Sequence, residues 1–324
     1  MRLSVLDTAP VWQGSTPAQS LRDTVDLAKH VERFGYRRFW VAEHHLAPSI
    51  ASTSPAVLVG QIASATSTIR VGSGGVLLPN HPPLIVAEQF GTLAALHPDR
   101  IDLGIGRAPG SDPGTVRLLR RSEAGFPAQL AELRGYFANE MIPAAAPVWL
   151  LGSSASSARL AGELGLPYAF AHHFNPADTL PAVAAYRESF KPSAALAQPY
   201  VLVCALMIAA DTDERAQFLA SSLALMIVRM SAGGLNHGRH VPPEIAVNQS
   251  YTDAERQLVK DRMAPRIIGG PDTVRRGISS LLASTGADEL MVITLIHDQA
   301  ERIRCYELIA DLTSSGLEVA DSPM

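Results

Sequence analysis

Apolar and polar segments alternate along the chain in a pattern that predicts strands and helices in turn. Short apolar runs, with the composition of strands buried on both faces, occur at residues 2–7, 39–42, 69–79, 101–110, 148–152, 167–174, 200–210 and 289–295. Between them lie longer segments with helical spacing, several opened by proline, at 16–34, 54–66, 82–97, 154–165, 176–190, 213–230, 271–285 and 299–315. The chain is therefore a series of strand–helix units.

About eight such units in 324 residues predict a (β/α)8 TIM barrel, an α/β fold that reaches this length as a single domain, here 1–324. A doubly wound open sheet is the alternative. The alternation of strands and helices is interrupted twice, after the fourth strand and after the seventh. After the fourth, residues 113–142 predict one or two helices. After the seventh, residues 231–266 are rich in glycine and proline at first and helical later. Because long excursions in compact domains are more often functional than linkers, we interpret 231–262 as a candidate active-site lid.

Composition narrows the range of partners and compartments. A formal charge of -4, with 18% charged and 6% aromatic residues, gives neither a basic surface nor a stacking platform, so no nucleic-acid partner is expected. No apolar run approaches the roughly 20 residues of a bilayer span, and the N-terminus does not have the pattern of a signal peptide. We expect a soluble cytoplasmic protein with no membrane partner. Cys204 and Cys305 lie in apolar segments and are expected to be buried thiols.

Titratable residues follow the predicted strand ends, where barrels of this kind carry their active sites. The stretch RRFWVAEHH (37–45) ends in Glu43, His44 and His45, and a second pair, His172 and His173, ends the sixth strand. Adjacent strand residues point to opposite sides, so two adjacent histidines are poorly placed to share a metal ion. The sequence therefore predicts no metal site and leaves a metal-dependent hydrolase as a minor alternative.

His44 is the strongest candidate for proton transfer. Alternation from Trp40 and Ala42 places it on their side of the strand, and a loop end frees it to enter a pocket. For His45 and His173 a hydrogen-bonded structural role is favoured. The sequence does not decide whether Glu43 orients a neighbouring group or holds an arginine.

Two further strand ends indicate a phosphate site. Arg107 lies in the glycine-rich exit GIGRAPG, and GSSASS (152–157) opens a helix with free backbone amides and small hydroxyl side chains. Alone, Arg107 fits a rim ion pair equally well, and the serines fit an ordinary N-cap. Together they favour a phosphate-bearing ligand. Neither GxGxxG after an early strand nor GxxxxGK[ST] is present, so a Rossmann nicotinamide site and a nucleotide triphosphatase are not supported.

Three stretches carry a resemblance to a known family. LDTAPVWQG, ERFGYRRFWVAEHH and IRVGSGGVLLPNHPPLIVAEQFGTLAALHPDRIDLGIGRAPG look like the N-terminal half of the bacterial luciferase-like flavin-dependent monooxygenases, particularly their single-chain branch. The resemblance covers residues 1–175 well and the rest weakly. It implies a (β/α)8 barrel, usually a homodimer, that takes reduced FMN from a separate flavin reductase and reacts it with dioxygen. A small organic substrate would be oxygenated through a flavin peroxide.

The resemblance also implies residue roles. His44 matches the catalytic histidine, and Glu43 lies beside it near the flavin; we expect Glu43 to orient His44. Gly74 and Gly75 fall where the family has a non-prolyl cis peptide against the flavin ring. Residues that match the FMN phosphate site are Arg107, Gly152, Ser153, Ser154 and Ser157.

The chain departs from the luciferase pattern at three positions. Gly106 replaces a reactive cysteine, Ser153 replaces a glutamate, and His172 replaces an aromatic residue and is expected in the substrate pocket. Light emission on long-chain aldehydes is therefore not implied. A deazaflavin-dependent hydride-transfer enzyme and a non-enzymatic flavin-binding relative remain the alternatives.

Overall fold

The strands of the barrel are short and parallel. The computed structural model describes residues 1–122, 124–233 and 238–314. In this part of the chain the strands are β1 (Leu3–Asp7), β2 (Arg38–Val41), β3 (Arg70–Leu77), β4 (Ile101–Gly106), β5 (Val148–Gly152), β6 (Tyr168–Phe170), β7 (Val201–Ala209), β8 (Ile267–Gly269) and β9 (Glu289–Ile293). Strands β1 to β7 pair in sequence, and β9 pairs with both β7 and β1. These eight strands close a barrel, which confirms the predicted fold.

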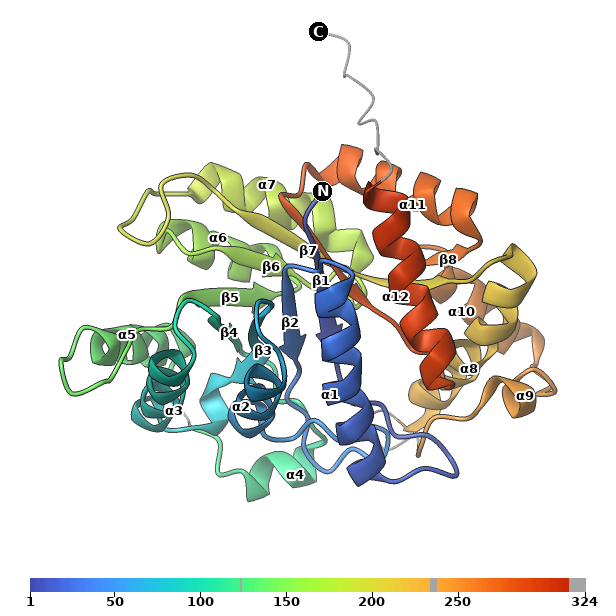
Figure 1. Cartoon of the computed structure of the whole chain (residues 1–324), viewed down its shortest axis with the longest axis horizontal. Coiled ribbons are helices and arrows are strands. Elements are labelled where there is room, and N and C mark those ends of the chain that lie inside the picture. Colours follow the sequence, from blue (N-terminus) through green and yellow to red (C-terminus); the bar gives the residue numbers. More distant parts are fainter. Residues whose placement is uncertain (123, 234–237, 315–324) are drawn as a thin grey trace, which may run out of the picture.

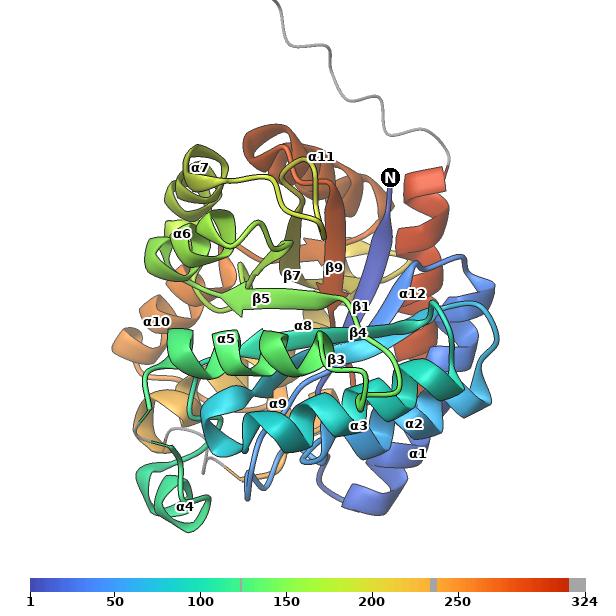
Figure 2. The same ribbon diagram turned by 90° about the vertical axis from the view of Figure 1, so that its left-hand side faces the viewer.

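Helices surround the barrel (Figure 1). They are α1 (Pro17–Arg33), α2 (Pro55–Ala65), α3 (Pro83–Leu96), α4 (Pro113–Leu118), α5 (Phe126–Phe137), α6 (Ala155–Glu163), α7 (Thr179–Ser189), α8 (Asp213–Gly233), α9 (Pro243–Ala246), α10 (Asp253–Met263), α11 (Pro271–Thr285) and α12 (Gln299–Ser314). Two short 3-10 helices, η1 (Leu78–Asn80) and η2 (Pro176–Asp178), follow β3 and precede α7. Figure 2 shows α1, α2, α3 and α5 lying side by side along one flank of the barrel.

Local sequence chemistry explains these elements. All nine residues of β7 are buried, as a continuous apolar run requires when a strand is covered on both faces. Helix α1 begins where Oγ1 of Thr16 accepts a hydrogen bond from the Gln19 amide at 3.1 Å, with Pro17 at the first helical position. Helix α11 ends at Gly286, whose φ of 55° is the left-handed conformation that glycine tolerates best. The main core lies between the strands and these helices.

The structure differs from the predicted elements in two places. Strand β8 was not predicted, because three residues are too few for a periodicity signal. Strand β8 pairs with Met207–Ala209 of β7, whereas β9 pairs with the preceding residues of β7, Leu202–Leu206. Strand β6 ends at Phe170 rather than continuing through the two histidines. The predicted insertion at 113–142 contains two helices, α4 and α5.

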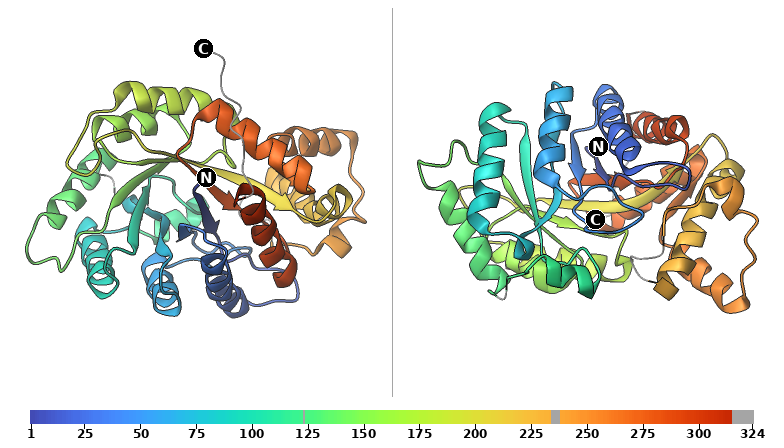
Figure 3. Two further views of the ribbon diagram at one scale, coloured as in Figure 1. Left: turned by 45° about the horizontal axis from the view of Figure 1, so that its top comes forward. Right: turned by 90° about the horizontal axis from the view of Figure 1, so that it is seen from below.

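The segment interpreted as a lid packs against one side of the barrel. Helices α9 and α10 contact α8, and residue 240 bridges to Trp12 in the loop after β1. Figure 3 shows this group of helices at the flank of the molecule. Within 231–233 and 238–262, no residue lines the pocket described below, and residues 234–237 lie outside the described residues. The lid role stays a prediction.

Charged side chains fill the amino-terminal end of the barrel. Nη1 of Arg38 donates to Asp102 at 2.7 Å, and its Nε donates to Glu289 at 2.6 Å. All three side chains are almost fully buried, and the guanidinium also lies over the ring of Trp149. Because each charge is paired, this cluster closes the barrel floor without leaving a bare ion in the core.

Helix α8 is long and apolar enough, by length and composition only, to cross a membrane. It is the one such helix in the described part of the chain. It packs against β7, β8, α9 and α10, as the core helix of a barrel does. Helices of that kind pass the same test, so the finding is weak evidence for a span.

Candidate active site

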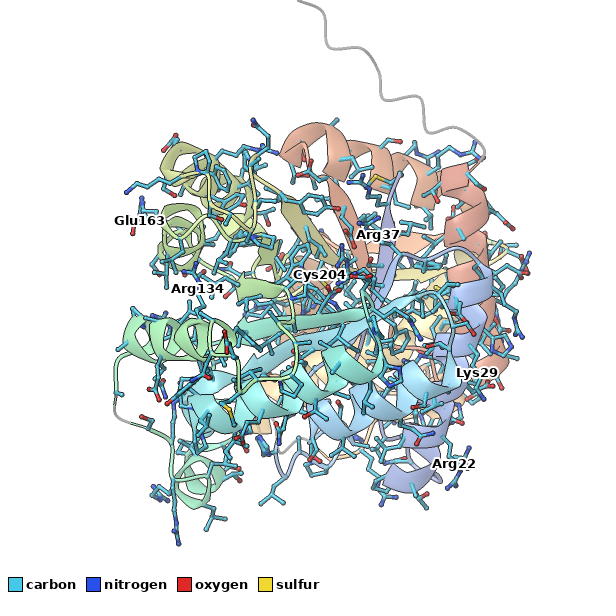
Figure 4. The ribbon with its side chains drawn as sticks, turned by 60° about the vertical axis from the view of Figure 1, so that its left-hand side comes forward. Arg22, Lys29, Arg37, Arg134, Glu163 and Cys204 are labelled. Carbon is cyan, nitrogen blue, oxygen red and sulfur yellow. The ribbon has the colours of Figure 1, made fainter. Side chains whose placement is uncertain are left out.

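A cavity of about 360 Å³ lies at the carboxyl ends of the strands. Of the residues predicted for the site, those that line it are Glu43, His44, Gly74, Gly75, Arg107, Gly152, Ser153, Ser154 and Ser157. Its inner wall is made of apolar side chains from strands around the barrel, namely Leu6, Trp40, Ala169, Leu202, Cys204 and Met291. Figure 4 labels Cys204 amid the barrel strands, whereas the labelled Arg22 and Glu163 lie on the outside.

One end of the cavity is suited to an anion. Helix α6 begins at Ser154, whose side chain makes no capping bond, so the first backbone amides keep their donors. Oγ of Ser157 donates to the Ser154 carbonyl at 2.8 Å and lies 3.0 Å from the Tyr168 hydroxyl. The Asn175 amide holds the Ser153 carbonyl at 3.0 Å. These bonds fix the loop while leaving the amides available to a ligand.

Two arginines stand at the same end. Arg107 is exposed, lines the cavity and makes no ion pair within the described residues, so the rim ion pair considered from the sequence is not seen. Arg121 donates to the carbonyls of Arg107 and Ala108 and to Oδ1 of Asn80. Burial and the neighbouring Arg107 guanidinium lower the pKa of Arg121. Arg121, which sequence reasoning missed because it lies far along an irregular insertion, therefore shapes the loop that carries Arg107.

Backbone rather than side chain lines the cavity at β3. The peptide bond between Gly74 and Gly75 is cis, as the resemblance implied. A Cβ added to Gly75 would lie 2.7 Å from the carbonyl oxygen of Gly104, and one on Gly74 would lie 2.6 Å from Leu6. Both contacts are closer than real Cβ atoms tolerate. At Gly75 the obstacle is backbone, so this position is limited to glycine, and the wall without side chains leaves a smooth surface for a planar ring.

His44 faces the inner part of the cavity, on the same side as Trp40 and Ala42. Its backbone amide donates to the Ser52 carbonyl at 3.0 Å, and its Nδ1 is buried with no hydrogen-bond partner among the described residues. Burial lowers the pKa of His44 to about 4; the Glu43 charge opposes the shift, and the neighbouring His45 adds to it. The imidazole is therefore neutral at pH 7 and holds one proton and one lone pair.

Glu43 does not orient His44 through a hydrogen bond, which corrects the predicted role. Its Oε1 accepts from Nε2 of His45 at 2.8 Å and from Nε2 of His81 at 2.9 Å, and its Oε2 accepts from the Leu77 amide at 3.0 Å. Burial acts to raise the pKa of Glu43, but the hydrogen bonds from His81, His45 and Leu77 outweigh it and the pKa is lowered. The carboxylate thus joins the ends of β2 and β3 beside the cavity.

Glu43, His45 and His81 also form the type of group that could hold a metal ion, with their ligand atoms within 4.8 Å of one another. Strand spacing could not reveal this cluster, because His81 comes from a different strand end. The two Nε2–Oε1 separations are hydrogen-bond lengths, and the bonds explain the arrangement without an ion. No metal is assigned here.

For the second histidine pair, the structure places the other histidine in the cavity than the one predicted. His173 lines the cavity and His172 does not. Nδ1 of His172 lies 2.7 Å from the Thr179 hydroxyl, and its Nε2 lies 3.4 Å from the Pro265 carbonyl, so it tethers two loops. The placement was wrong because β6 ends at Phe170, and strand alternation no longer applies in the turn that follows.

The residues present fit FMN. The open amides of α6 and Arg107, which has no ion-pair partner in the described part of the chain, suit a phosphate. The bare Gly74–Gly75 wall suits a flat ring, and the inner wall is apolar. The donor set therefore agrees with a phosphate-bearing aromatic cofactor.

Comparison with known proteins shows the family to which the chain belongs. The family described as Luciferase-like monooxygenase matches residues 1–137 and 115–289. The chain belongs to this family. It is 48% identical to the uncharacterized protein YvbT of Bacillus subtilis (strain 168), over 96% of each chain. It is 44% identical to a luciferase-like monooxygenase of Escherichia coli (strain K12), over 95% of this chain and 96% of that one.

Solved structures agree with the fold. The crystal structure of apo-MsnO8 has a TM-score of 0.89 at 40% identity, covering 97% of this chain and 98% of that chain. The oxygenating constituent of 3,6-diketocamphane monooxygenase from Pseudomonas putida, in complex with FMN, has a TM-score of 0.73 at 19% identity, over 97% and 98%. An F420-dependent secondary alcohol dehydrogenase has a TM-score of 0.67 at 13% identity, over 96% and 98%. The last two show the fold alone.

Proposed function

We propose that the protein is a flavin-dependent monooxygenase that uses reduced FMN and dioxygen to oxygenate a small organic substrate. The observation that carries the proposal is a single cavity with two unlike ends. One end presents Arg107 and the free amides of α6, and the other is an apolar chamber containing the neutral imidazole of His44. Membership of the luciferase-like monooxygenase family supports the same reaction class.

The anion end would bind the phosphate. Arg107 offers a planar guanidinium with no carboxylate partner in the described chain, and the amides at Ser154 to Ser157 point donors at the same region. Gly152 and Ser153 lead into this helix end. Gly74 and Gly75 would give the ring a backbone surface, so that the cofactor lies across the barrel mouth.

Reduced flavin, when bound, supplies the electrons that activate dioxygen, so that one oxygen atom enters the substrate and the other leaves as water. The chain must keep bulk water from this chemistry, and the apolar wall around Leu6, Trp40 and Met291 would contribute to this. His44 holds or moves a proton at its unpartnered Nδ1. Glu43 is a positioning residue that fixes the loops on either side.

We propose that the electrons come from outside this chain. Its sequence has no GxGxxG after an early strand, and the resemblance to the family implies a separate flavin reductase, which would deliver reduced FMN in the cytoplasm. We include a homodimer in the proposal. Apolar side chains exposed on α2 and α3, Val57, Leu84, Ile85 and Leu96, are the surface that a second copy would cover. Light scattering of the purified protein tests the dimer.

A deazaflavin-dependent hydride transfer is the second candidate, because the same fold occurs in the F420-dependent dehydrogenase. Anaerobic titration with reduced FMN and with reduced deazaflavin separates the two. We expect tighter binding of reduced FMN and, after mixing with ¹⁸O₂ and a substrate panel, one labelled oxygen in the product. Preferential binding of the deazaflavin, with hydride transfer in the absence of oxygen, would overturn the monooxygenase proposal.

A further inference from the structure

A second histidine, His173, faces His44 from across the barrel mouth. The closed order of the eight strands is β1 to β7 followed by β9, so β2 and β6 lie four strands apart and opposite each other. His44 follows β2, His173 follows β6, and both line the cavity. A molecule in the inner chamber therefore lies between two imidazoles.

The hydrogen bonding of His173 determines which ring nitrogen carries its proton. Nδ1 lies 3.1 Å from the backbone carbonyl oxygen of Cys204, which also accepts from the His173 backbone amide at 2.9 Å. A carbonyl oxygen can only accept, so Nδ1 must be the donor. In the neutral ring Nε2 is then unprotonated. Its lone pair has no donor from the described residues.

The surroundings keep this ring uncharged. Burial lowers the pKa of His173 to about 4; the bond to the Cys204 carbonyl opposes the shift, and nearby His172, Arg266 and His44 add to it. No carboxylate bonds to the ring in the described chain. The Cys204 thiol, on the adjacent strand, has a pKa raised by burial and stays protonated. Nε2 is consequently a hydrogen-bond acceptor throughout the physiological pH range.

The inner chamber offers nothing else to pair with a charged ligand. Apart from the histidines and the protonated Cys204 thiol, the described residues that line the cavity include two ionisable side chains, Glu43 and Arg107. The Glu43 carboxylate is occupied by His45, His81 and the Leu77 amide, and Arg107 stands at the phosphate end. A charged substrate in the chamber would lose its hydration without gaining a partner. An uncharged substrate would not leave a charge without a partner.

We propose that His173 selects the substrate, with its Nε2 accepting a hydrogen bond from an O–H or N–H group of an uncharged molecule held opposite His44. The proposal rests on the proposed function for the identity of that molecule as substrate. The hydrogen bond itself depends only on this chain. A ligand that lacks a donor would leave the Nε2 lone pair unsatisfied.

The test uses protein labelled with ¹⁵N in its histidines and three probes that share a benzene ring: phenol, which donates a hydrogen bond, anisole, which does not, and benzoate, which is charged. The His173 resonances are identified by their absence from the spectrum of His173→Phe. If His173→Phe does not fold, His173→Gln is used for the same assignment. We expect a protonated Nδ1 and a bare Nε2. Phenol should move the Nε2 resonance, whereas anisole and benzoate should not.

Affinity gives a second readout. His173→Gln, or His173→Phe, should weaken phenol binding roughly two- to tenfold, the worth of one neutral hydrogen bond, and leave anisole binding unchanged. His30→Gln, on α1 and outside the cavity lining, is the matched control. A proton on Nε2, an equal response to anisole, or no response to phenol would each overturn the proposal.

Repeating the titration in the presence of oxidised FMN separates substrate from cofactor. If FMN alone moves the Nε2 resonance and phenol then has no effect, the acceptor belongs to the cofactor and the substrate role is lost. A protein that responds to phenol but fails to bind FMN or to oxygenate any substrate would contradict the proposed function and not this inference.

Discussion

Oε1 of Glu43 accepts a hydrogen bond from Nε2 of His81 at 2.9 Å, and this bond joins the ends of two neighbouring strands. The same carboxylate holds His45 and the Leu77 amide. Glu43 is 2% exposed, so it anchors the rim from inside, next to the cavity wall formed by Gly74 and Gly75. The acid beside the candidate catalytic histidine therefore acts on the loops.

Replacing Glu43 by alanine should lower the free energy of unfolding by about 3 kcal/mol, because the buried Leu77 amide and the partly buried His45 and His81 rings lose their charged acceptor. Urea unfolding at pH 7 measures the change. Glu88→Ala, an exposed carboxylate on α3, is the control and should change stability little. Equal stability of the two variants would contradict the anchoring role.

Arg107→Ala should weaken FMN binding roughly 10- to 100-fold while changing riboflavin binding much less, since only FMN carries the phosphate. Quenching of flavin fluorescence measures both affinities. Arg117→Ala, an exposed arginine on α4 outside the cavity lining, should leave both unchanged. The same loss for riboflavin as for FMN would remove the phosphate role of Arg107.

The parts of the site that follow strand periodicity were predictable from the sequence. The barrel, and the meeting of Arg107 with the serines at one end, follow from repeated strand–helix units, because parallel strands deliver their carboxyl ends to one face. The separation of His44 from His45 also follows, because adjacent strand residues point apart.

What the sequence could not show depends on turns and on contacts between strands. His173 rather than His172 enters the cavity because β6 ends at Phe170, and a turn has no fixed alternation. The bond from His81 to Glu43 joins residues that are 38 positions apart in the sequence. The buried pairing of Arg38 with Asp102 joins residues that are 64 positions apart. No local pattern encodes such partners, since the register between strands decides them.

The stability of the protein should fall as the pH drops from 6.5 toward 4. In the unfolded chain a histidine gains its proton near pH 6.5, whereas His44 and His173, whose pKa values are lowered to about 4 by burial, stay neutral in the fold. Their contribution is therefore fully present above pH 6.5 and is lost as the pH falls through 4.

His173→Gln should remove one of these two contributions. Between pH 7 and pH 5 the variant should lose about 2 kcal/mol less unfolding free energy than the natural protein, at about 1.4 kcal/mol per pH unit per histidine. Urea unfolding at the two pH values gives the comparison. If both proteins lose the same free energy, His173 titrates normally in the fold.

His44→Ala should retain FMN affinity within about threefold and lose product formation by roughly 100-fold or more, as expected when a proton-transfer group is removed. The reason is that Nδ1 of His44 is a buried proton site in the chamber with no hydrogen-bond partner among the described residues, whereas the phosphate end lies elsewhere. Oxygen consumption, hydrogen peroxide and product are measured together. The variant should still consume oxygen but convert it to peroxide, while His30→Ala, outside the cavity lining, should behave as the natural protein does. Product yield per oxygen that is unchanged in His44→Ala would exclude this histidine from the reaction.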